Sequence, residues 1–410
     1  MCAPVIISQR NYSWTACHTD RRWTTPCSGA VGQALGSGEP MRPDLPASSR
    51  AIAIDVLVHG AQSRAQLAKK TGLSAPTLTR LVRPLLDAGV LVESESVRTT
   101  GRGRSSVLLD VVADDHRYVG VKLTRESIYA VLTNLRAEVL ASETLPEPSL
   151  DVPDVVSCVA GVVSRMEDRA GRPVRGVGVT VGGRVDKGET VADSPFLDWH
   201  EVPFRTLLAE QVDAPLFLAN DVVGLTMAQQ WFGYGRTYPD FALLTVGAGV
   251  GYGLVINHEL VPTLVSPIGH LPVDPHGPLC PAGHRGCMTA FVTSGAMANT
   301  VSLAHGRLTT YDEVLELAEA GDPAAARVVA EAAHAVGRAT AAITSLTGVD
   351  RIILSGEGVR LVEIAPDSLR AGRVEYADEQ VSVLDPVIRP MDFLEWARGA
   401  AVVAIKASFP

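Results

Sequence analysis

Strand-length apolar runs alternate with helical patterns from Arg117 to the C-terminus, and this order occurs twice. The first round predicts strands at 118–121, 128–133, 139–142 and 174–181, with a helix at 152–169. The second predicts strands at 215–219, 241–246 and 252–256, with a helix at 221–232. Two such rounds in one chain predict a two-lobed α/β body.

The length of 410 residues, with 46% hydrophobic and 20% charged content, exceeds what one compact core accommodates. We therefore expect two or three domains. No apolar stretch approaches the roughly 18 residues that a membrane span requires. Six cysteines are too few for a dense disulfide scaffold in a chain of this length. These features favour a protein of the reducing cytoplasm, with no membrane partner.

Charge is divided unevenly along the chain. Residues 50–110 hold nine Lys/Arg and five Asp/Glu, a balance of +4. The whole chain carries −9, so the remainder carries −13. A small basic module on an acidic body indicates that one end of the molecule meets phosphate groups.

Residues 1–48 show neither helical nor strand periodicity and scatter three cysteines among Ser, Thr, Gly and Pro. We expect this segment to be disordered. Because Met41 stands directly before the first helical pattern, an over-extended gene start is the alternative. The basic-then-apolar order of a secretory signal is absent here.

Three short helical patterns follow, at 51–59, 63–70 and 74–88, and then two strands at 90–92 and 106–109. Ser63 and Ser74 are suitable N-cap residues, and Pro76 stands in the first turn of the third helix. Three helices and a basic hairpin predict a winged helix-turn-helix domain over residues 49–112. A small helical dimerisation domain is the alternative.

The third helix presents polar and basic side chains beside an apolar stripe, as a DNA-reading helix does. Pro84, deep in this helix, removes a hydrogen bond at a cost of roughly 3 kcal/mol, so we expect a kink or an early end there. Two arginines flanked by glycines suit a narrow minor groove. The predicted DNA-binding residues are Ser63, Ala75, Pro76, Thr77, Thr79, Arg80, Arg83, Arg102 and Arg104.

Two motifs in the body have both a functional and a structural interpretation. Four alternating glycines in residues 247–253 let backbone N–H groups approach a phosphate, but a tight hairpin also favours glycine. Asn220 and Asp221 follow a predicted strand and open a helix, where a carboxylate can act as a general base. A helix cap is the commoner explanation of that pair.

His270, Cys280, His284 and Cys287 lie within 18 residues. Thiolates and imidazoles in a glycine-containing loop are typical ligands of tetrahedral zinc. The spacing is not a C-x-x-C pair, so a free-thiol loop and a disulfide are the alternatives.

The order of these motifs, together with the segment Leu354-Ser-Gly-Glu-Gly-Val359, resembles the ROK family of repressors and sugar kinases, specifically its xylose-repressor type. The resemblance covers residues 49–410. It implies an actin-like and hexokinase-like (ribonuclease H-like) ATPase fold for residues 117–410, with lobes at about 117–220 and 221–410.

The resemblance also implies roles for single residues. Asn220 would bind a sugar hydroxyl, Asp221 would stand at the kinase base position, and His270 would line the ligand pocket. His270, Cys280 and Cys287 fall on the family's zinc ligands. The family's middle zinc cysteine is Ala282 here, so His284 or a water would complete the site.

Other positions depart from the kinase pattern. The first phosphate loop, Asp followed by Gly-Gly-Thr in the kinases, reads Lys-Leu-Thr-Arg-Glu at 122–126. At three positions where the resemblance implies a polar sugar-binding residue, this chain has Phe196, Pro267 and Thr289 instead. These changes make ATP chemistry doubtful and point to an altered ligand or to none.

The sequence therefore predicts a transcriptional regulator, most simply a repressor of carbohydrate-related genes, that is not an enzyme. Its expected partners are a double-stranded DNA operator, a sugar or sugar-derived effector and further copies of itself in a homodimer or homotetramer. Two rivals remain: an active sugar kinase with a fused DNA-binding domain, and a constitutive DNA-binding protein with a purely structural body.

Overall fold

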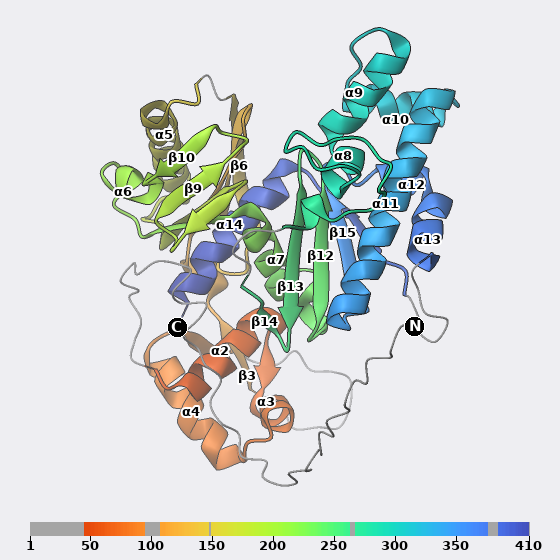
Figure 1. Cartoon of the computed structure of the whole chain (residues 1–410). Coiled ribbons are helices and arrows are strands. Elements are labelled where there is room, and N and C mark those ends of the chain that lie inside the picture. The colour runs from red at the N-terminus through yellow and green to blue at the C-terminus, as the bar shows by residue number, and fades with distance from the viewer. Residues whose placement is uncertain (1–44, 95–106, 147–148, 263–266, 376–383, 410) are drawn as a thin grey trace, which may run out of the picture.

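The computed structural model describes residues 45–94, 107–146, 149–262, 267–375 and 384–409. The expected disorder of residues 1–44 and the arginines Arg102 and Arg104 lie outside the described residues. Within them, a small N-terminal unit (residues 45–111) lies against one end of a larger body (residues 118–409) that contains two five-stranded sheets and a small three-stranded one (Figure 1).

The N-terminal unit consists of three helices and a three-stranded sheet of order β1-β3-β2. Two predicted caps are present. The Ser63 hydroxyl accepts a hydrogen bond from the Gln66 amide, and the Ser74 hydroxyl accepts one from the Thr77 amide. The elements are α2 (Ala47–His59), β1 (Gln62–Ser63), α3 (Arg64–Thr71), α4 (Ala75–Asp87), β2 (Leu91–Ser94) and β3 (Leu108–Val111).

Two expectations for this unit need correction. The folded part begins before residue 49, because α2 starts at Ala47 and Leu45 packs into the core at 6% exposure. Helix α4 does not end at Pro84 but continues to Asp87. Val82 and Leu85 on either side are completely buried, so tertiary packing retains the last turn despite the missing N–H.

The first sheet of the body has the order β11-β7-β4-β5-β6, in which β11, β7 and β4 run parallel. Helix α5 packs on this sheet in a core rich in valine. The elements are β4 (Tyr118–Leu123), β5 (Ser127–Thr133), β6 (Val139–Pro146), α5 (Val152–Ala170), β7 (Gly176–Val181), α6 (Phe204–Ala209) and β11 (Leu216–Asn220). A small antiparallel sheet follows β7: β8 (Arg184–Asp186), β9 (Thr190–Ser194) and β10 (Trp199–Val202).

The second sheet has the order β14-β13-β12-β15-β16 and packs against α11, whose buried face is rich in alanine. Its strands are β12 (Phe241–Val246), β13 (Val250–Ile256), β14 (Glu259–Leu260), β15 (Ile352–Gly356) and β16 (Val387–Pro390). Its helices are α8 (Met288–Val292), α9 (Ser294–His305), α10 (Tyr311–Glu319), α11 (Pro323–Thr347), α12 (Leu361–Ile364) and α13 (Pro366–Val374).

Helices α7 (Asp221–Phe232) and α14 (Phe393–Ser408) lie in the centre of the body (Figure 1). Helix α14 packs directly on β4 and β7. A Cβ atom on Gly120 would lie 2.0 Å from the Ala397 carbonyl oxygen, and one on Gly178 would lie 1.8 Å from that of Ala400. The expected second lobe, 221–410, is therefore wrong for its last helix, which returns to the first sheet.

The N-terminal unit and the body share one hydrophobic core, to which α2 contributes Val56 and the body contributes Trp231 and Phe409. The Arg236 guanidinium also donates to the Val58 carbonyl at 3.5 Å. The predicted two-lobed α/β class is confirmed by the two sheets and their helices. None of the described helices combines the length and apolar character that crossing a bilayer requires.

Candidate functional site

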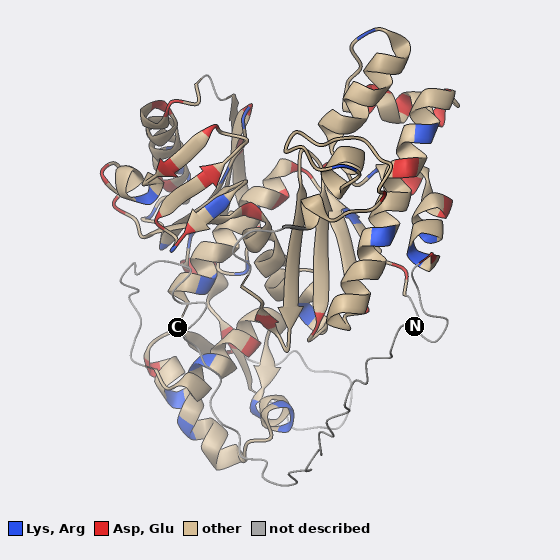
Figure 2. Cartoon of the chain, in the orientation of Figure 1, with Lys and Arg blue, Asp and Glu red and all other residues tan. Residues whose placement is uncertain are grey.

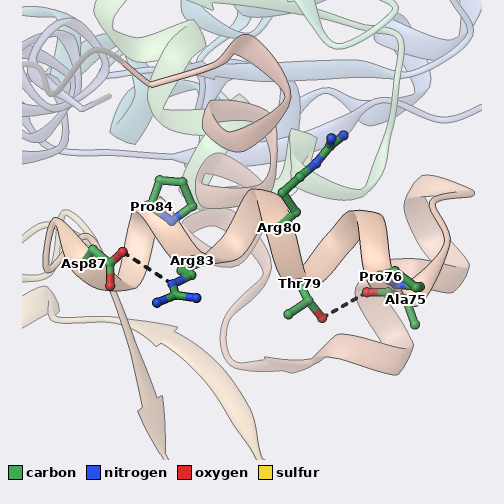
Figure 3. A pocket seen from close by; sticks show the side chains of 7 residues that line it. All are labelled: Ala75, Pro76, Thr79, Arg80, Arg83, Pro84 and Asp87. Carbon is green, nitrogen blue, oxygen red and sulfur yellow. Dashed lines mark hydrogen bonds and ion pairs between the residues drawn. The ribbon is translucent and has the colours of Figure 1, made fainter.

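One exposed face of α4 is hollowed, with a volume of about 700 Å³ (Figure 3). The hollow brings together five of the predicted DNA-binding residues on a single helix face. Its lining residues are Ala75, Pro76, Thr79, Arg80, Arg83, Pro84 and Asp87.

The two arginines of this face are available to a partner. Arg80 is exposed and has no ion-pair partner in the described part of the chain. Arg83 lies 3.9 Å from Asp87, with both side chains largely exposed, so the pair contributes little. Figure 2 shows basic residues on both α3 and α4. The face can therefore meet phosphate or base edges.

The hydroxyl groups predicted to contact DNA are already bonded within the unit. The Ser63 side chain is buried and completes a capping box with Gln66. The Thr77 hydroxyl lies 2.9 Å from that of Ser74, and the Thr79 hydroxyl donates to the Ala75 carbonyl at 2.9 Å. Ser63 thus holds α3 in place, while the exposed Thr79 lies on the presented face.

A buried ion pair stands where the first sheet meets α7. The Lys122 ammonium, near the end of β4, donates to Oδ2 of Asp221, the first residue of α7. Their side chains are only 6% and 14% exposed. The other Asp221 oxygen accepts from the Val222 amide at 2.8 Å. Lys122 also lies 5.5 Å from the centre of the Trp396 ring.

Asn220 caps α7. Its Oδ1 accepts from the amides of Val222 at 2.9 Å and Val223 at 3.2 Å. Its Nδ2 donates to the Gly183 carbonyl at 2.8 Å. The capping interpretation of the Asn-Asp pair is confirmed for Asn220.

Phe196 lies between the turn after β7 and the turn between β12 and β13. A Cβ atom on Gly182 would lie 2.9 Å from the Phe196 ring, and one on Gly249 would lie 3.0 Å from it. Thr289, another altered sugar-binding position, donates its hydroxyl to the Gly269 carbonyl at 2.7 Å. An aromatic ring and an internally bonded hydroxyl thus stand at two of the positions where the sequence departs from the expected sugar-binding pattern.

The 122–126 segment contains the β4–β5 turn, and the glycine-rich segment 247–253 contains the β12–β13 turn. In the β4–β5 turn, the Thr124 hydroxyl donates to the Ser127 carbonyl at 2.9 Å and closes a tight turn. In the β12–β13 turn, Val246 pairs with Val250, which leaves three residues in the turn. The Ala248 amide of this turn donates to Glu357 at 2.8 Å.

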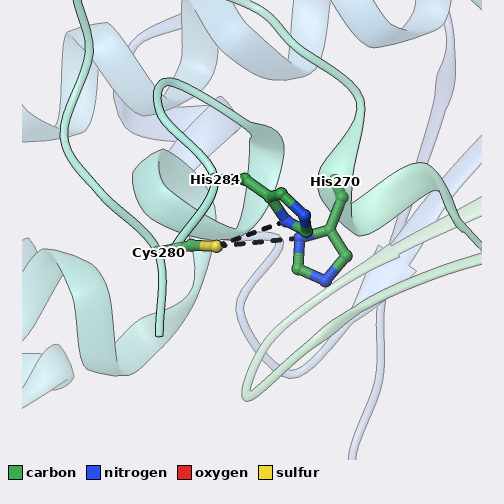
Figure 4. A group of neighbouring side chains, drawn as sticks. All are labelled: His270, Cys280 and His284. Atoms are coloured by element: carbon green, nitrogen blue, oxygen red, sulfur yellow. Dashed lines mark hydrogen bonds between the residues drawn. The ribbon is translucent and has the colours of Figure 1, made fainter. Parts of the chain in front are cut away.

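His270, Cys280 and His284 place their donor atoms within 4.8 Å of one another (Figure 4). The Cys280 Sγ lies 3.8 Å from His270 Nδ1 and 3.7 Å from His284 Nδ1. The Cys287 Sγ lies 3.8 Å from the same His270 atom. The structure thus brings His270, Cys280 and His284 together as one group and places Cys287 beside His270.

This donor set fits zinc. Zinc bonds of ~2.3 Å to sulfur and ~2.0–2.1 Å to nitrogen set tetrahedral S and N ligands about 3.6 Å apart. The observed distances of 3.7–3.8 Å match this edge. His284 comes from the turn that also contains Ala282, and the Cys280 amide donates to the His284 carbonyl at 2.8 Å.

The electrostatics favour the metal-ligand form of His270 and Cys280 but not of Cys287. Burial, together with the neighbouring His284, lowers the pKa of His270 and favours the neutral imidazole. Burial alone would raise the pKa of Cys280, but hydrogen bonds from the His284 backbone and from Cys287 lower it overall. Burial raises the pKa of Cys287.

The sequence did not indicate the partners of Asp221 and Lys122. Neither the Lys122–Asp221 pair nor the approach of Trp396 to Lys122 was predicted. The glutamate of the Gly-Glu-Gly segment was noted only as part of a motif. A basic residue in place of the expected phosphate-loop carboxylate was the one signal for the ion pair.

A model of the ROK family matches residues 118–406. The xylose repressor of Bacillus spizizenii is 23% identical over 277 residues, covering 65% of this chain and 71% of that protein. The DNA-binding transcriptional repressor Mlc of Escherichia coli is 26% identical over 348 residues, covering 79% of this chain and 85% of Mlc.

Solved structures show the same fold. A ROK family transcriptional regulator, described as a homologue of E. coli Mlc, matches with a TM-score of 0.74 and 21% identity, over 88% of this chain and 97% of that one. A ROK hexokinase from Thermus thermophilus matches with a TM-score of 0.61 and 26% identity, over 70% of this chain and 97% of that one. The body therefore has the actin-like and hexokinase-like fold.

Proposed function

The chain belongs to the ROK family, and from this premise we propose that it is a DNA-binding transcriptional regulator, a repressor of carbohydrate-related genes. Its N-terminal unit is a winged helix-turn-helix domain, assigned to residues 49–112. The observation that carries the proposal is the exposed face of α4, where Arg80 and Arg83 extend without strong internal partners. The relatives named as repressors support the same function.

The kinase-like body acts in regulation and not in phosphoryl transfer. Transfer to a sugar hydroxyl needs a free general base and a carboxylate that holds magnesium. Asp221, at the base position, is paired with the Lys122 ammonium, and the β4–β5 turn has neither the carboxylate nor the glycines of a phosphate loop. This arrangement opposes the rival reading as an active sugar kinase.

The body senses a small molecule and assembles the regulator in the cytoplasm as a homodimer or homotetramer. The proposed effector is a sugar or sugar derivative that meets Asn220, Asp221 and His270. Because Asn220 and Asp221 are bonded internally and Phe196 fills space beside them, the effector must displace these contacts. Displacement of that kind would couple binding to a movement of α7, which reaches the N-terminal unit at its other end.

The proposal includes a structural zinc ion that holds the loop after His270 in place. The ligands would be His270, Cys280, His284 and Cys287, and zinc bound there would fix the loop at the edge of the ligand pocket. With four protein ligands, zinc has no open position for a reactive water, so such a site stabilises the fold and is not catalytic.

DNA selection tests this function. The full chain is incubated with a random duplex library, and the recovered sequences are titrated by fluorescence anisotropy at two salt concentrations. We expect a pseudo-palindromic sequence to be enriched and bound, and coupled ADP release with hexoses and pentoses to stay at background. No enrichment over the random library would overturn the regulator assignment, and sugar-dependent turnover lost in Asp221→Asn would favour the kinase.

A further inference from the structure

The side chain of Glu357 turns back onto the β12–β13 turn. Glu357 lies between Gly356 and Gly358, directly after β15, and its Oε1 accepts from the Ala248 amide at 2.8 Å. A Cβ atom on Gly247 would lie only 1.9 Å from the same oxygen. The carboxylate therefore occupies the space that the absent side chain of Gly247 leaves open.

The turn beneath this carboxylate is held from both sides. The Gly358 amide donates to the Val246 carbonyl at 2.8 Å, which joins the Glu357 segment to β12. The Ser294 amide, at the start of α9, donates to the Gly247 carbonyl at 2.9 Å. These bonds position the Ala248 N–H without help from Glu357.

No Lys or Arg side chain in the described ranges forms an ion pair with Glu357, and the Ala248 N–H that donates to it belongs to the backbone. A glycine-rich turn that presents a backbone N–H to an anion is a recognised kind of phosphate site. A carboxylate and a phosphate group accept such a bond in the same way. The seated carboxylate thus identifies the position at which this turn holds an anion.

We propose that Glu357 is an internal anion that occupies a latent phosphate site of the 247–249 turn. Its natural competitors are phosphate groups, as in pyrophosphate or the phosphate chain of a nucleotide. The carboxylate excludes them by filling the site and by charge repulsion. The body would then not bind nucleotides, and this holds whether or not the N-terminal unit binds DNA.

Pyrophosphate binding tests the proposal. The full chain, Glu357→Ala, Glu357→Gln and Glu363→Ala are titrated with pyrophosphate by isothermal calorimetry. Glu363 is an exposed residue of α12, so its replacement matches the charge change away from the turn. We expect Glu357→Ala to bind at least ~10-fold more tightly than the parent, a gain of about 1.4 kcal/mol. Glu357→Gln, which removes the charge but keeps the bulk, should gain less, and Glu363→Ala should match the parent.

Two results would overturn the proposal: equal pyrophosphate affinity in the parent and both Glu357 variants, or an equal gain in Glu363→Ala. If Glu357→Ala does not fold, as judged by circular dichroism, Glu357→Gln alone decides, since an affinity equal to that of the parent contradicts the charge argument. DNA binding, measured on the same variants, is expected to stay at the parent level. Failure of the anion site is therefore distinguishable from failure of the regulator assignment.

Discussion

Lys122 and Asp221, 99 residues apart in sequence, form a buried ion pair at the carboxyl ends of two parallel strands of the first sheet. The pair joins the end of β4 to the start of α7. The two opposite charges compensate each other at a place from which water is largely excluded.

Breaking this pair should destabilise the body strongly. Lys122→Met or Asp221→Asn leaves one uncompensated buried charge, at an expected cost of about 3–5 kcal/mol in the free energy of unfolding. The double variant should regain much of that loss, because no charge remains. Urea denaturation measures all three, and the exposed pair Arg327–Glu331 provides the control, with an expected effect below about 1 kcal/mol. Losses that simply add in the double variant would contradict the pairing.

Arg80→Ala should weaken binding to the selected operator by about 1–3 kcal/mol and relax specificity at one base position. The reason is that Arg80 is exposed on the hollowed face of α4 and is not committed to an internal ion pair among the described residues. Fluorescence anisotropy gives the affinity. Arg327→Ala, on the exposed side of α11, is the matched control and should bind as the parent does. Unchanged affinity in Arg80→Ala would mean that α4 is not the reading helix.

The purified chain should contain about one equivalent of zinc, held with the affinity typical of structural sites. Cys280→Ser and His284→Ala should each reduce this content, because each removes one member of a cluster with distances of 3.7–3.8 Å. His276→Ala, an exposed histidine of the same loop, should leave it unchanged. Metal analysis after dialysis provides the measurement. Zinc content unaffected by both ligand variants would place the metal elsewhere.

Acid should destabilise the N-terminal unit through Asp55. Burial alone would raise the pKa of Asp55, but hydrogen bonds from His59, Lys70 and Gln62 hold it well below its ordinary value. The folded state then binds fewer protons than the unfolded state, so this stabilisation is complete above about pH 5 and is lost as the pH falls.

Asp55→Asn should therefore lose less of its unfolding free energy than the parent between about pH 6 and pH 3. Urea titrations at the two pH values provide the test. Asp367→Asn, which changes a largely exposed carboxylate on α13, should behave as the parent does. If Asp55→Asn loses as much unfolding free energy as the parent on acidification, Asp55 is not a source of the acid sensitivity.

Local signals allowed much of the fold to be predicted. Helix α7 and strand β12 have the expected bounds, and the Ser63 and Ser74 caps begin the helices that they were expected to begin. The reason is that periodicity and capping depend on residues a few positions apart. The group of His270, Cys280 and His284 was predictable for the same reason, since these residues lie close together in the sequence.

Contacts between distant segments could not be predicted in this way. Nothing in the residues around 248 indicates that Glu357 will supply the partner of that amide, 109 positions away. Likewise, the apolar residues of α14 indicate a buried helix but not which sheet it covers. Pro84 shows the opposite limit, where a correct local rule was overridden by the burial of Val82 and Leu85.

The return of α14 to the first sheet affects how the protein is made. Strands β4 and β7 are synthesised early, whereas α14, the 16-residue helix that covers one of their faces, follows more than 200 residues later in the chain. Until then an apolar face of the nascent first sheet has no partner, and the contact that closes it spans most of the chain. The body is therefore complete only once α14 has been synthesised, and a chain truncated before α14 should be retained by chaperones or aggregate.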